Sequence, residues 1–250
     1  MNKTIETEFD NQILSICINR PEKKNSLTYN EFCELTKIIE NATIDDNVKV
    51  IIISSKGDVF CAGIDFTTYI ETPFPKVISQ VGKLFSAFIE CTKVILVAVN
   101  GKAIGIGVTM LLLSDCIFCT DNSSFYTPFL KVGLYPEGCS SYLFSRRLGN
   151  SVTSHLMFAD GEIISKTAKD FGLVLDVYPK EEISKRVKDY GLKICKNSAK
   201  RLKEFKQMLR GYDKEKLKEA NNNEMKMMLM NSENSQEFQN TLSFYKKPKF

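Results

Sequence analysis

The stretch VILVAVNGKAIGIG, residues 94–107, carries most of the information about the fold. Its first six residues, Val94–Val99, form an unbroken apolar run rich in β-branched side chains, which is typical of a strand covered on both faces of a sheet. Asn100-Gly101 predicts a turn, and the glycines at 105 and 107 lead into a short buried helix that ends near Ser114. Residues 117–120 return as a strand. The stretch therefore predicts a strand, a glycine-containing loop and a helix.

The same order of elements occurs nearer the N-terminus. Residues 48–53 form a second β-branched run, and a helix is expected over 77–90. Two strands over 4–9 and 13–18 read as a hairpin, and Thr28 is a candidate N-cap for an amphipathic helix. Repeated strand, loop and helix units predict an α/β fold with active-site loops at the ends of the strands.

The pattern changes after Pro179, where helical periodicity with many lysines and arginines takes over. We predict helices over 181–196, 199–209, 213–230 and 235–245. We divide the chain into a core over residues 1–190, which carries the active site, and an α-helical region over 191–250, which packs on the core or on a neighbouring subunit. Four methionines between 225 and 230 fit core or subunit packing.

Composition excludes several classes of protein. The chain has 250 residues, 43% of them hydrophobic, and a net charge of +4, as expected for a globular domain. Its basic C-terminal part suits nucleic acid, an acidic membrane or a phosphorylated small molecule, and charge alone does not choose between them. No apolar run approaches the roughly 20 residues that span a bilayer. Eight cysteines without an N-terminal apolar segment indicate a reducing compartment, and the Cys116-x-x-Cys119 spacing lacks the second pair that a zinc site needs.

Two loops are candidates for binding an anion. Val59–Phe66 runs from a strand through a turn of small residues into a helix start, and Gly105-Ile106-Gly107 also precedes a helix. The first backbone N–H groups of a helix have no intrahelical partner and favour negative charge. Together the two loops can form a two-donor oxyanion hole.

With these loops the sequence resembles the enoyl-CoA hydratase/isomerase (crotonase) family over nearly its whole length. The matching segments are Asn19–Leu27, Phe60–Asp65, Val99–Gly101 with Ala103–Gly105, and Ser114-Asp115. The resemblance implies a ClpP/crotonase-like fold of repeated ββα units with an α-helical C-terminal trimerisation region. It also implies that the backbone amides of Ile64 and Ile106 are the oxyanion-hole donors.

A single carboxylate distinguishes this sequence within the family. At the positions of the two glutamates that hydratases use to activate water, this chain has Thr109 and Phe129. Instead, Gly133–Ser141 resembles the motif of the peroxisomal-type Δ3,Δ2-enoyl-CoA isomerases, which implies that Glu137 is the catalytic residue. One carboxylate suffices for isomerisation, because it first removes a proton beside the thioester carbonyl and then returns it two carbons further along. The resemblance thus implies an isomerase that acts in the oxidation of unsaturated fatty acids.

The resemblance also implies how the substrate is held and what else the protein binds. The residues expected to contact the acyl-CoA are Lys23, Lys24, Leu27, Cys61, Ala62, Asp65, Phe66, Phe129, Phe244 and Lys246, with Lys247 beside them. No separate cofactor and no metal is expected, because the substrate carries coenzyme A. The expected assembly is a homotrimer or a hexamer, without nucleic acid and without a membrane span.

Two alternatives remain open from the sequence. Another crotonase reaction, such as dienoyl-CoA isomerisation or thioester hydrolysis, would need a further carboxylate, for which Asp65 is the candidate. A non-catalytic CoA-binding or interaction module, as in chromatin-associated relatives, is disfavoured by the intact Glu137. An intracellular soluble protein of the peroxisome or mitochondrion is implied by the resemblance, although Lys247–Phe250 differs from a Ser-Lys-Leu signal and the first strand begins too early for a transit peptide. The only histidine, His155, is expected to be structural or solvent-exposed.

Overall fold

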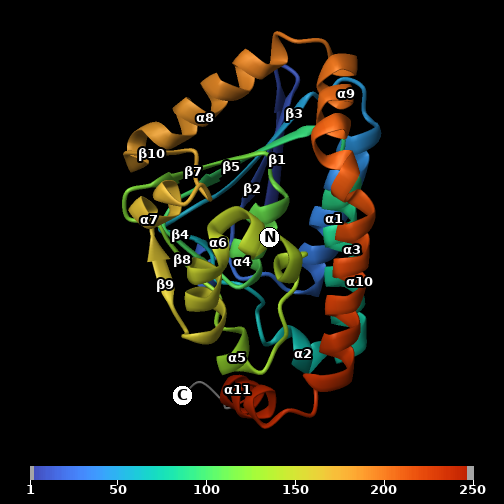
Figure 1. Cartoon of the computed structure of the whole chain (residues 1–250), viewed down its shortest axis with the longest axis vertical. Coiled ribbons are helices and arrows are strands. Elements are labelled where there is room, and N and C mark those ends of the chain that lie inside the picture. Colours follow the sequence, from blue (N-terminus) through green and yellow to red (C-terminus); the bar gives the residue numbers. More distant parts are fainter. Residues whose placement is uncertain (1–2, 247–250) are drawn as a thin grey trace.

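The structure, a computed structural model, describes residues 3–246 and contains two β-sheets (Figure 1). The larger sheet has the strand order β1-β2-β3-β5-β7-β10, and the smaller has the order β4-β6-β8-β9. The six strands of the larger sheet are β1 (Ile5–Asp10), β2 (Ile13–Ile18), β3 (Val50–Ser55), β5 (Val94–Val99), β7 (Cys116–Thr120) and β10 (Asp176–Tyr178). The four of the smaller sheet are β4 (Val59–Cys61), β6 (Lys102–Ile104), β8 (Ser124–Tyr126) and β9 (Glu162–Ile164).

Consecutive strands of the central repeats go to different sheets. β3, β5 and β7 enter the larger sheet, and the strands that follow them, β4, β6 and β8, enter the smaller one. All neighbouring pairs among β2, β3, β5, β7 and β10 are parallel, and so are β4 with β6 and β6 with β8. Each of these units is thus ββα, with its two strands in different sheets.

The larger sheet is covered on both faces, as its continuous apolar strands require. On one face Ile183 and Val187 of α8 (Lys180–Cys195) pack with side chains such as Ile52 and Leu96. On the other face the alternate strand residues join the main core, which includes α1 (Tyr29–Ile44) and α3 (Phe74–Glu90). Figure 1 shows α8 across one face of the sheet, with α10 (Lys214–Asn231) running along α3 on the opposite side.

The remaining helices are short or surround these layers. They are α2 (Thr68–Glu71), α4 (Ile106–Thr109), α5 (Phe129–Val132), α6 (Ser140–Phe158), α7 (Ser165–Asp170), α9 (Ala199–Arg210) and α11 (Gln236–Lys246), with 3-10 turns at Pro21–Lys23, Met110–Leu113 and Gly211–Asp213. α11 lies against α5 at the end of the molecule that also holds α2 (Figure 1). Within residues 3–246 no helix is both long enough and apolar enough to cross a membrane.

Most of the predicted elements are confirmed. Thr28 is the N-cap of α1, where its backbone N–H donates to Glu31 Oε2 at 2.8 Å in a capping box. The four predicted C-terminal helices are present with ends shifted by at most one residue. Of the methionines on α10, Met225 and Met228 are buried, whereas Met227 and Met230 are exposed. The division between residues 190 and 191 falls within α8 and stays a prediction.

Candidate active site

The two glycine loops predicted to bind an anion pack directly against each other. A Cβ atom at Gly107 would lie 2.7 Å from the carbonyl oxygen of Cys61 and 2.9 Å from its Cβ, so only glycine permits this approach. Gly63 makes a similar contact, because a Cβ there would lie 3.1 Å from the carbonyl oxygen of Ile104. The structure therefore brings the loop after β4 and the loop after β6 into contact.

The backbone amides of Ile64 and Ile106 belong to these two loops. Ile106 is the first residue of α4, and the first amides of a helix have no intrahelical acceptor. Around Ile64, the Leu27 N–H donates to Gly63 O at 2.9 Å and the Asp65 N–H donates to Leu27 O at 2.8 Å. Within residues 3–246 neither Ile64 nor Ile106 donates its amide to a backbone acceptor, so both remain available for a ligand oxygen.

Glu137 lies inside the protein, close to α4. Its side chain is 1% exposed, and its Oε1 accepts a 2.8 Å hydrogen bond from Thr109 Oγ1. Thr109 ends α4, three residues after Ile106, and a helix rises about 1.5 Å per residue. The residue that donates to the carboxylate thus lies about one helical turn from Ile106.

The environment of Glu137 makes it an unusually strong base for a carboxylate. Burial raises its pKa from 4.5 to about 8, the hydrogen bond from Thr109 opposes that rise, and the nearby charge of Glu224 adds to it. Such a group takes up and releases protons near neutral pH, as a general acid-base catalyst must.

The turn after Glu137 is tightly packed. Gly138 has φ 73°, and a Cβ there would lie 2.7 Å from Phe85 Cε1 and 2.9 Å from Thr109 Cβ. The next residue, Cys139, also has a positive φ, 58°, and precedes α6. Glu137 is therefore attached to a turn that has little freedom to move.

The cysteines near this site are poor nucleophiles. Burial raises the pKa of the Cys61 thiol to about 12. The hydrogen bond from the Gly63 N–H opposes this rise, and the charge of Glu137 adds to it. Burial also raises the pKa of Cys139 to about 12, and the charge of Glu224 adds to that rise. Both thiols are protonated at neutral pH, which argues against covalent catalysis by either one.

Five of the predicted contacts of coenzyme A lie together around the loop after β4, namely Lys23, Lys24, Leu27, Cys61 and Ala62. The carbonyl oxygen of Lys24 accepts from the Ala62 N–H at 3.0 Å, and Leu27 forms a parallel bridge with Ile64. The exposed loop of Lys23 and Lys24 therefore lies beside Cys61 and Ala62.

Asp65 is engaged by neighbouring protein groups. Its Oδ2 forms a 2.7 Å ion pair with Arg20, and its Oδ1 accepts from Thr67 Oγ1 at 2.7 Å. Burial acts to raise the pKa of Asp65, but the bonds from Thr67 and Arg20 outweigh it and lower the pKa. This arrangement fixes the loop and leaves Asp65 poorly suited to the role of a base.

The end of the chain reaches the same region through aromatic contacts. Phe66 stacks on Tyr245 of α11 with 5.4 Å between the ring centroids, and it also contacts Phe238. Phe244 is 71% exposed, and Lys246 is exposed beside it. Lys247 lies outside the described residues.

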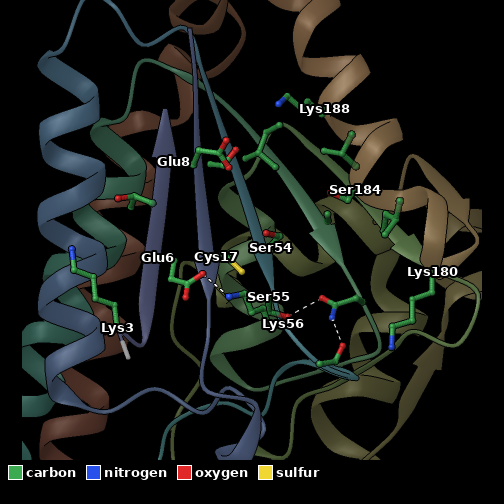
Figure 2. Close-up of a pocket in the computed structure, with 18 residues that line it drawn as sticks. Lys3, Glu6, Glu8, Cys17, Ser54, Ser55, Lys56, Lys180, Ser184 and Lys188 are labelled. Atoms are coloured by element: carbon green, nitrogen blue, oxygen red, sulfur yellow. Dashed lines mark hydrogen bonds and ion pairs between the residues drawn. The ribbon is translucent and has the colours of Figure 1, made fainter. Parts of the chain in front are cut away.

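Two cavities differ in their relation to Glu137. One of about 530 Å³ has a mainly apolar surface, to which Phe129 and Leu134 contribute, and it is also lined by Pro136 and Ser140, which precede and follow Glu137 in the sequence. Another of about 860 Å³ lies on the opposite face of the larger sheet, below α8 (Figure 2). Lys180, Ser184 and Lys188 of α8 line it together with Glu8 and Cys17 of the sheet, and none of the predicted site residues lines it.

Two contributors to this site were not predicted as partners of Glu137. Thr109 is predicted only as the residue at a hydratase glutamate position, and Glu224 is not among the predicted site residues. Glu224 lies on the buried stripe of α10, seven residues after Leu217 and four before Met228, so its helical spacing could have marked it. Within residues 3–246, no three His, Cys, Asp or Glu side chains are arranged to hold a metal ion.

Comparison with known proteins agrees with this geometry. The sequence profile of the enoyl-CoA hydratase/isomerase family matches residues 8–250. The chain is 31% identical to rat enoyl-CoA delta isomerase 2 over 233 residues, which cover 89% of this chain and 58% of the rat protein. It is 29% identical to mouse peroxisomal enoyl-CoA delta isomerase 3, over 88% and 71% of the two chains. Mouse chromodomain Y-like protein 2 is 31% identical over 82% of this chain and 42% of its own length.

Solved structures match almost the whole fold. An enoyl-CoA hydratase/isomerase from Pseudoalteromonas atlantica superposes with a TM-score of 0.90 at 31% identity, covering 99% of this chain and 100% of its own. OdaA from Pseudomonas aeruginosa superposes with a TM-score of 0.91 at 26% identity, over 99% and 100% of the two chains. These matches confirm the predicted crotonase fold. Since the profile, the relatives and the structures agree, the chain belongs to the enoyl-CoA hydratase/isomerase family.

Proposed function

We propose that this protein is a Δ3,Δ2-enoyl-CoA isomerase in which Glu137 is the only acid-base group. The observation that carries the proposal is the buried Glu137 carboxylate, hydrogen-bonded to Thr109 on the helix that begins with Ile106. The names of the rat and mouse isomerase relatives support the same activity.

In the proposed reaction Glu137 removes a proton from C2 of a 3-enoyl-CoA, the carbon next to the thioester carbonyl. The electron pair of the broken C–H bond delocalises over C2 to C4 and onto the carbonyl oxygen, which gives a dienolate. The protonated Glu137 then returns the proton to C4, and the double bond lies between C2 and C3. No atom is gained or lost, so no second reactant is required.

The amides of Ile64 and Ile106 are the proposed donors to the thioester oxygen. Charge on this oxygen is greatest in the dienolate, so donors held in place stabilise that state more than the substrate. Contact between the loops of Gly63 and Gly107 supports this role, because it keeps the two amides in fixed relation.

Hydration fits the site less well than isomerisation. The residues at the two hydratase glutamate positions are Thr109, which donates to Glu137, and Phe129, which is buried. Neither side chain can activate a water molecule as a carboxylate does. The raised pKa of Glu137, about 8, suits one group that must first accept a proton and then donate it.

We propose that the acyl chain extends toward the cavity of about 530 Å³ that Phe129 lines. Because Glu137 is 1% exposed, its covering side chains must move when this substrate enters. Lys23 and Lys24 on one loop and Lys246 at the end of α11 are proposed to meet the phosphates of coenzyme A. Oxidation of unsaturated fatty acids in the peroxisome is the proposed setting, in line with the name of the mouse relative.

A homotrimer, alone or paired into a hexamer, is the proposed assembly. One side of α9 and of the turn that follows carries four apolar or aromatic side chains that are 66–91% exposed, Phe205, Met208, Leu209 and Tyr212. The last three lie three, four and seven residues after Phe205. An apolar stripe of this kind is typical of a subunit interface. Sedimentation analysis should give a trimer or hexamer, and Leu209→Glu should yield smaller species; a monomeric wild-type protein would contradict the proposal.

The function is tested by incubating the protein with a 3-enoyl-CoA and following the absorbance of the conjugated 2-enoyl product. Conversion is expected, with little hydration of a 2-enoyl-CoA under the same conditions. Hydration that is faster than isomerisation would favour another reaction of the family. Binding of acyl-CoA without turnover of either substrate would favour a non-catalytic module.

A further inference from the structure

A second buried carboxylate, Glu224 on α10, binds the segment that immediately follows Glu137. Glu224 is 5% exposed, and its Oε2 accepts a 2.8 Å hydrogen bond from the Cys139 N–H. Its Oε1 accepts from both the N–H and the hydroxyl of Ser141, at 2.8 and 2.6 Å. The three donors belong to the residues two and four positions after Glu137, whereas Glu224 is more than 80 residues away from them in sequence.

These bonds serve the start of α6. The helix begins at Ser140, and its N-cap residue Cys139 makes no capping hydrogen bond with its side chain. The first N–H groups of a helix need acceptors and attract negative charge. Glu224 supplies both from another helix, so the geometry of the Glu137 turn depends on the position of α10.

α10 is in turn fixed to the core helix α3. Asn221 donates to Gly82 O at 3.0 Å, and Met225 packs so closely on Gly82 that a Cβ there would lie 3.0 Å from Met225 Cγ. The Cys139 thiol also donates to Leu217 O of α10 at 3.2 Å. Glu224 therefore connects a rigid pair of helices to the turn that carries the proposed base.

We propose that Glu224 is a positioning residue for the isomerase reaction, holding the turn of Glu137 in place and setting the charge that Glu137 experiences. This inference rests on the function proposed above. Glu224 is not proposed to contact substrate; it acts through the backbone of residues 139 and 141.

The charge of Glu224 has a predictable effect on Glu137. The titratable groups placed around Glu137 are Cys61 of β4, Tyr69 of α2 and Glu224 of α10, and Thr109 of α4 is its hydrogen-bond donor. Burial raises the pKa values of Cys61 and Tyr69, so both are neutral at the pH of the reaction. Burial raises the pKa of Glu224, and the hydrogen bonds from Ser141 and Cys139 oppose that rise. In its ionised form Glu224 is the group among these that repels the ionised Glu137, so removing its charge should lower the pKa of Glu137.

The test compares Glu224→Gln, Glu224→Ala and Ser141→Ala with Glu219→Gln, an exposed glutamate of the same helix. Glutamine keeps the size of Glu224 and one acceptor oxygen, so kcat for a 3-enoyl-CoA should fall about tenfold, and about a hundredfold in Glu224→Ala, as for a displaced catalytic group. KM should stay within about threefold of the wild-type value, because the misplaced Glu137 slows proton transfer and not substrate binding. Glu219→Gln should match wild type.

The pH dependence separates positioning from a purely structural role. In Glu224→Gln the acid limb of kcat/KM should move to lower pH, because the ionised Glu137 is no longer opposed by a second carboxylate. In Ser141→Ala the charge of Glu224 is kept, so kcat should fall by a few-fold with the acid limb unmoved. Thermal unfolding of each variant is measured alongside, and Ser141→Ala, altered at an exposed residue, keeps the test available if Glu224→Ala does not fold.

Two failures are distinguishable. If Glu137→Gln abolishes turnover while both Glu224 variants keep the kcat and acid limb of Glu219→Gln, the role of Glu224 is refuted and the isomerase mechanism stands. If Glu137→Gln turns over as fast as wild type, the proposed function itself fails, and the role of Glu224 fails with it.

Discussion

Replacing Thr109 by valine removes the one hydrogen bond that the Glu137 carboxylate accepts within residues 3–246. Thr109 is fully buried, and its Oγ1 donates to Glu137 Oε1 at 2.8 Å. Valine has nearly the same shape, so the change deletes a donor without opening a cavity. The bond favours the ionised carboxylate and lowers the pKa of Glu137, so its loss should raise that pKa further.

The size of the effect follows from the charge on the acceptor. A hydrogen bond to a charged group contributes about 1.5–3 kcal/mol, and about 1.36 kcal/mol corresponds to one pKa unit. The acid limb of kcat/KM should therefore move from about pH 8 in the wild type to about 1–2 units higher in Thr109→Val. At pH 7 the ionised fraction of Glu137, and with it the rate, should fall about 10- to 100-fold, and the difference should narrow to a few-fold by pH 9.5.

The assay is the rate of 2-enoyl-CoA formation from a 3-enoyl-CoA between pH 6 and pH 9.5, corrected for the stability of each protein. Thr36→Val is the matched control, because Thr36 is a buried threonine of α1 that hydrogen-bonds to Phe32 and Gln80. It should leave the acid limb where it is. A Thr109→Val enzyme with the wild-type pH profile would refute the link between this bond and the basicity of Glu137.

Three further predictions concern stability and the loops. Because its pKa is raised from 4.5 to about 8, Glu137 favours the folded state below about pH 4.5, and this contribution is lost as pH rises through about 8. Glu137→Gln should therefore unfold at the same temperature as wild type at pH 5. At pH 9 it should unfold at a higher temperature, because its free energy of unfolding should exceed that of wild type by a few kcal/mol, at about 1.36 kcal/mol per pKa unit. Equal midpoint temperatures for the two proteins at both pH values would count against the raised pKa. Gly107→Ala should lower the free energy of unfolding by about 1–3 kcal/mol and also lower kcat, because its methyl group would lie 2.7 Å from Cys61 O. Unfolding in urea and steady-state rates test this, and full activity would show that the two loops can separate freely. Arg20→Ala removes the ion-pair partner of Asp65, which is 7% exposed, and should lower the free energy of unfolding measured in urea by about 3 kcal/mol. The acid limb of kcat/KM should not move, and a shifted limb would indicate that Asp65 takes part in the reaction.

Long apolar strands and amphipathic helices could be predicted from the sequence because their patterns are local. Val94–Val99 is an uninterrupted apolar run, and it lies in the middle of the larger sheet. The smaller sheet is different, since β4, β6 and β8 have three residues each. Three residues show no measurable periodicity, so their pairing became clear only through the resemblance and the structure.

The chemistry was predictable in part. Glu137 was identified through the motif around it, but its burial and its bond to Thr109 depend on contacts across 28 residues of sequence, which no local pattern reports. Glu224 is harder to find, since it follows three asparagines in a polar helix and its partners are more than 80 residues away. Tertiary contacts of this kind set the basicity of a carboxylate, which is why the sequence names the base but not its strength.

The central claim is that one buried carboxylate carries the proton in both steps. The most direct measurement is the kcat of Glu137→Gln for a 3-enoyl-CoA at pH 8.5, compared with wild type at equal folded concentration. Glutamine keeps the shape of Glu137 but cannot accept a proton, so the rate should fall at least about a hundredfold, the usual contribution of a general acid-base group. A Glu137→Gln enzyme that isomerises its substrate at the wild-type rate would contradict the account.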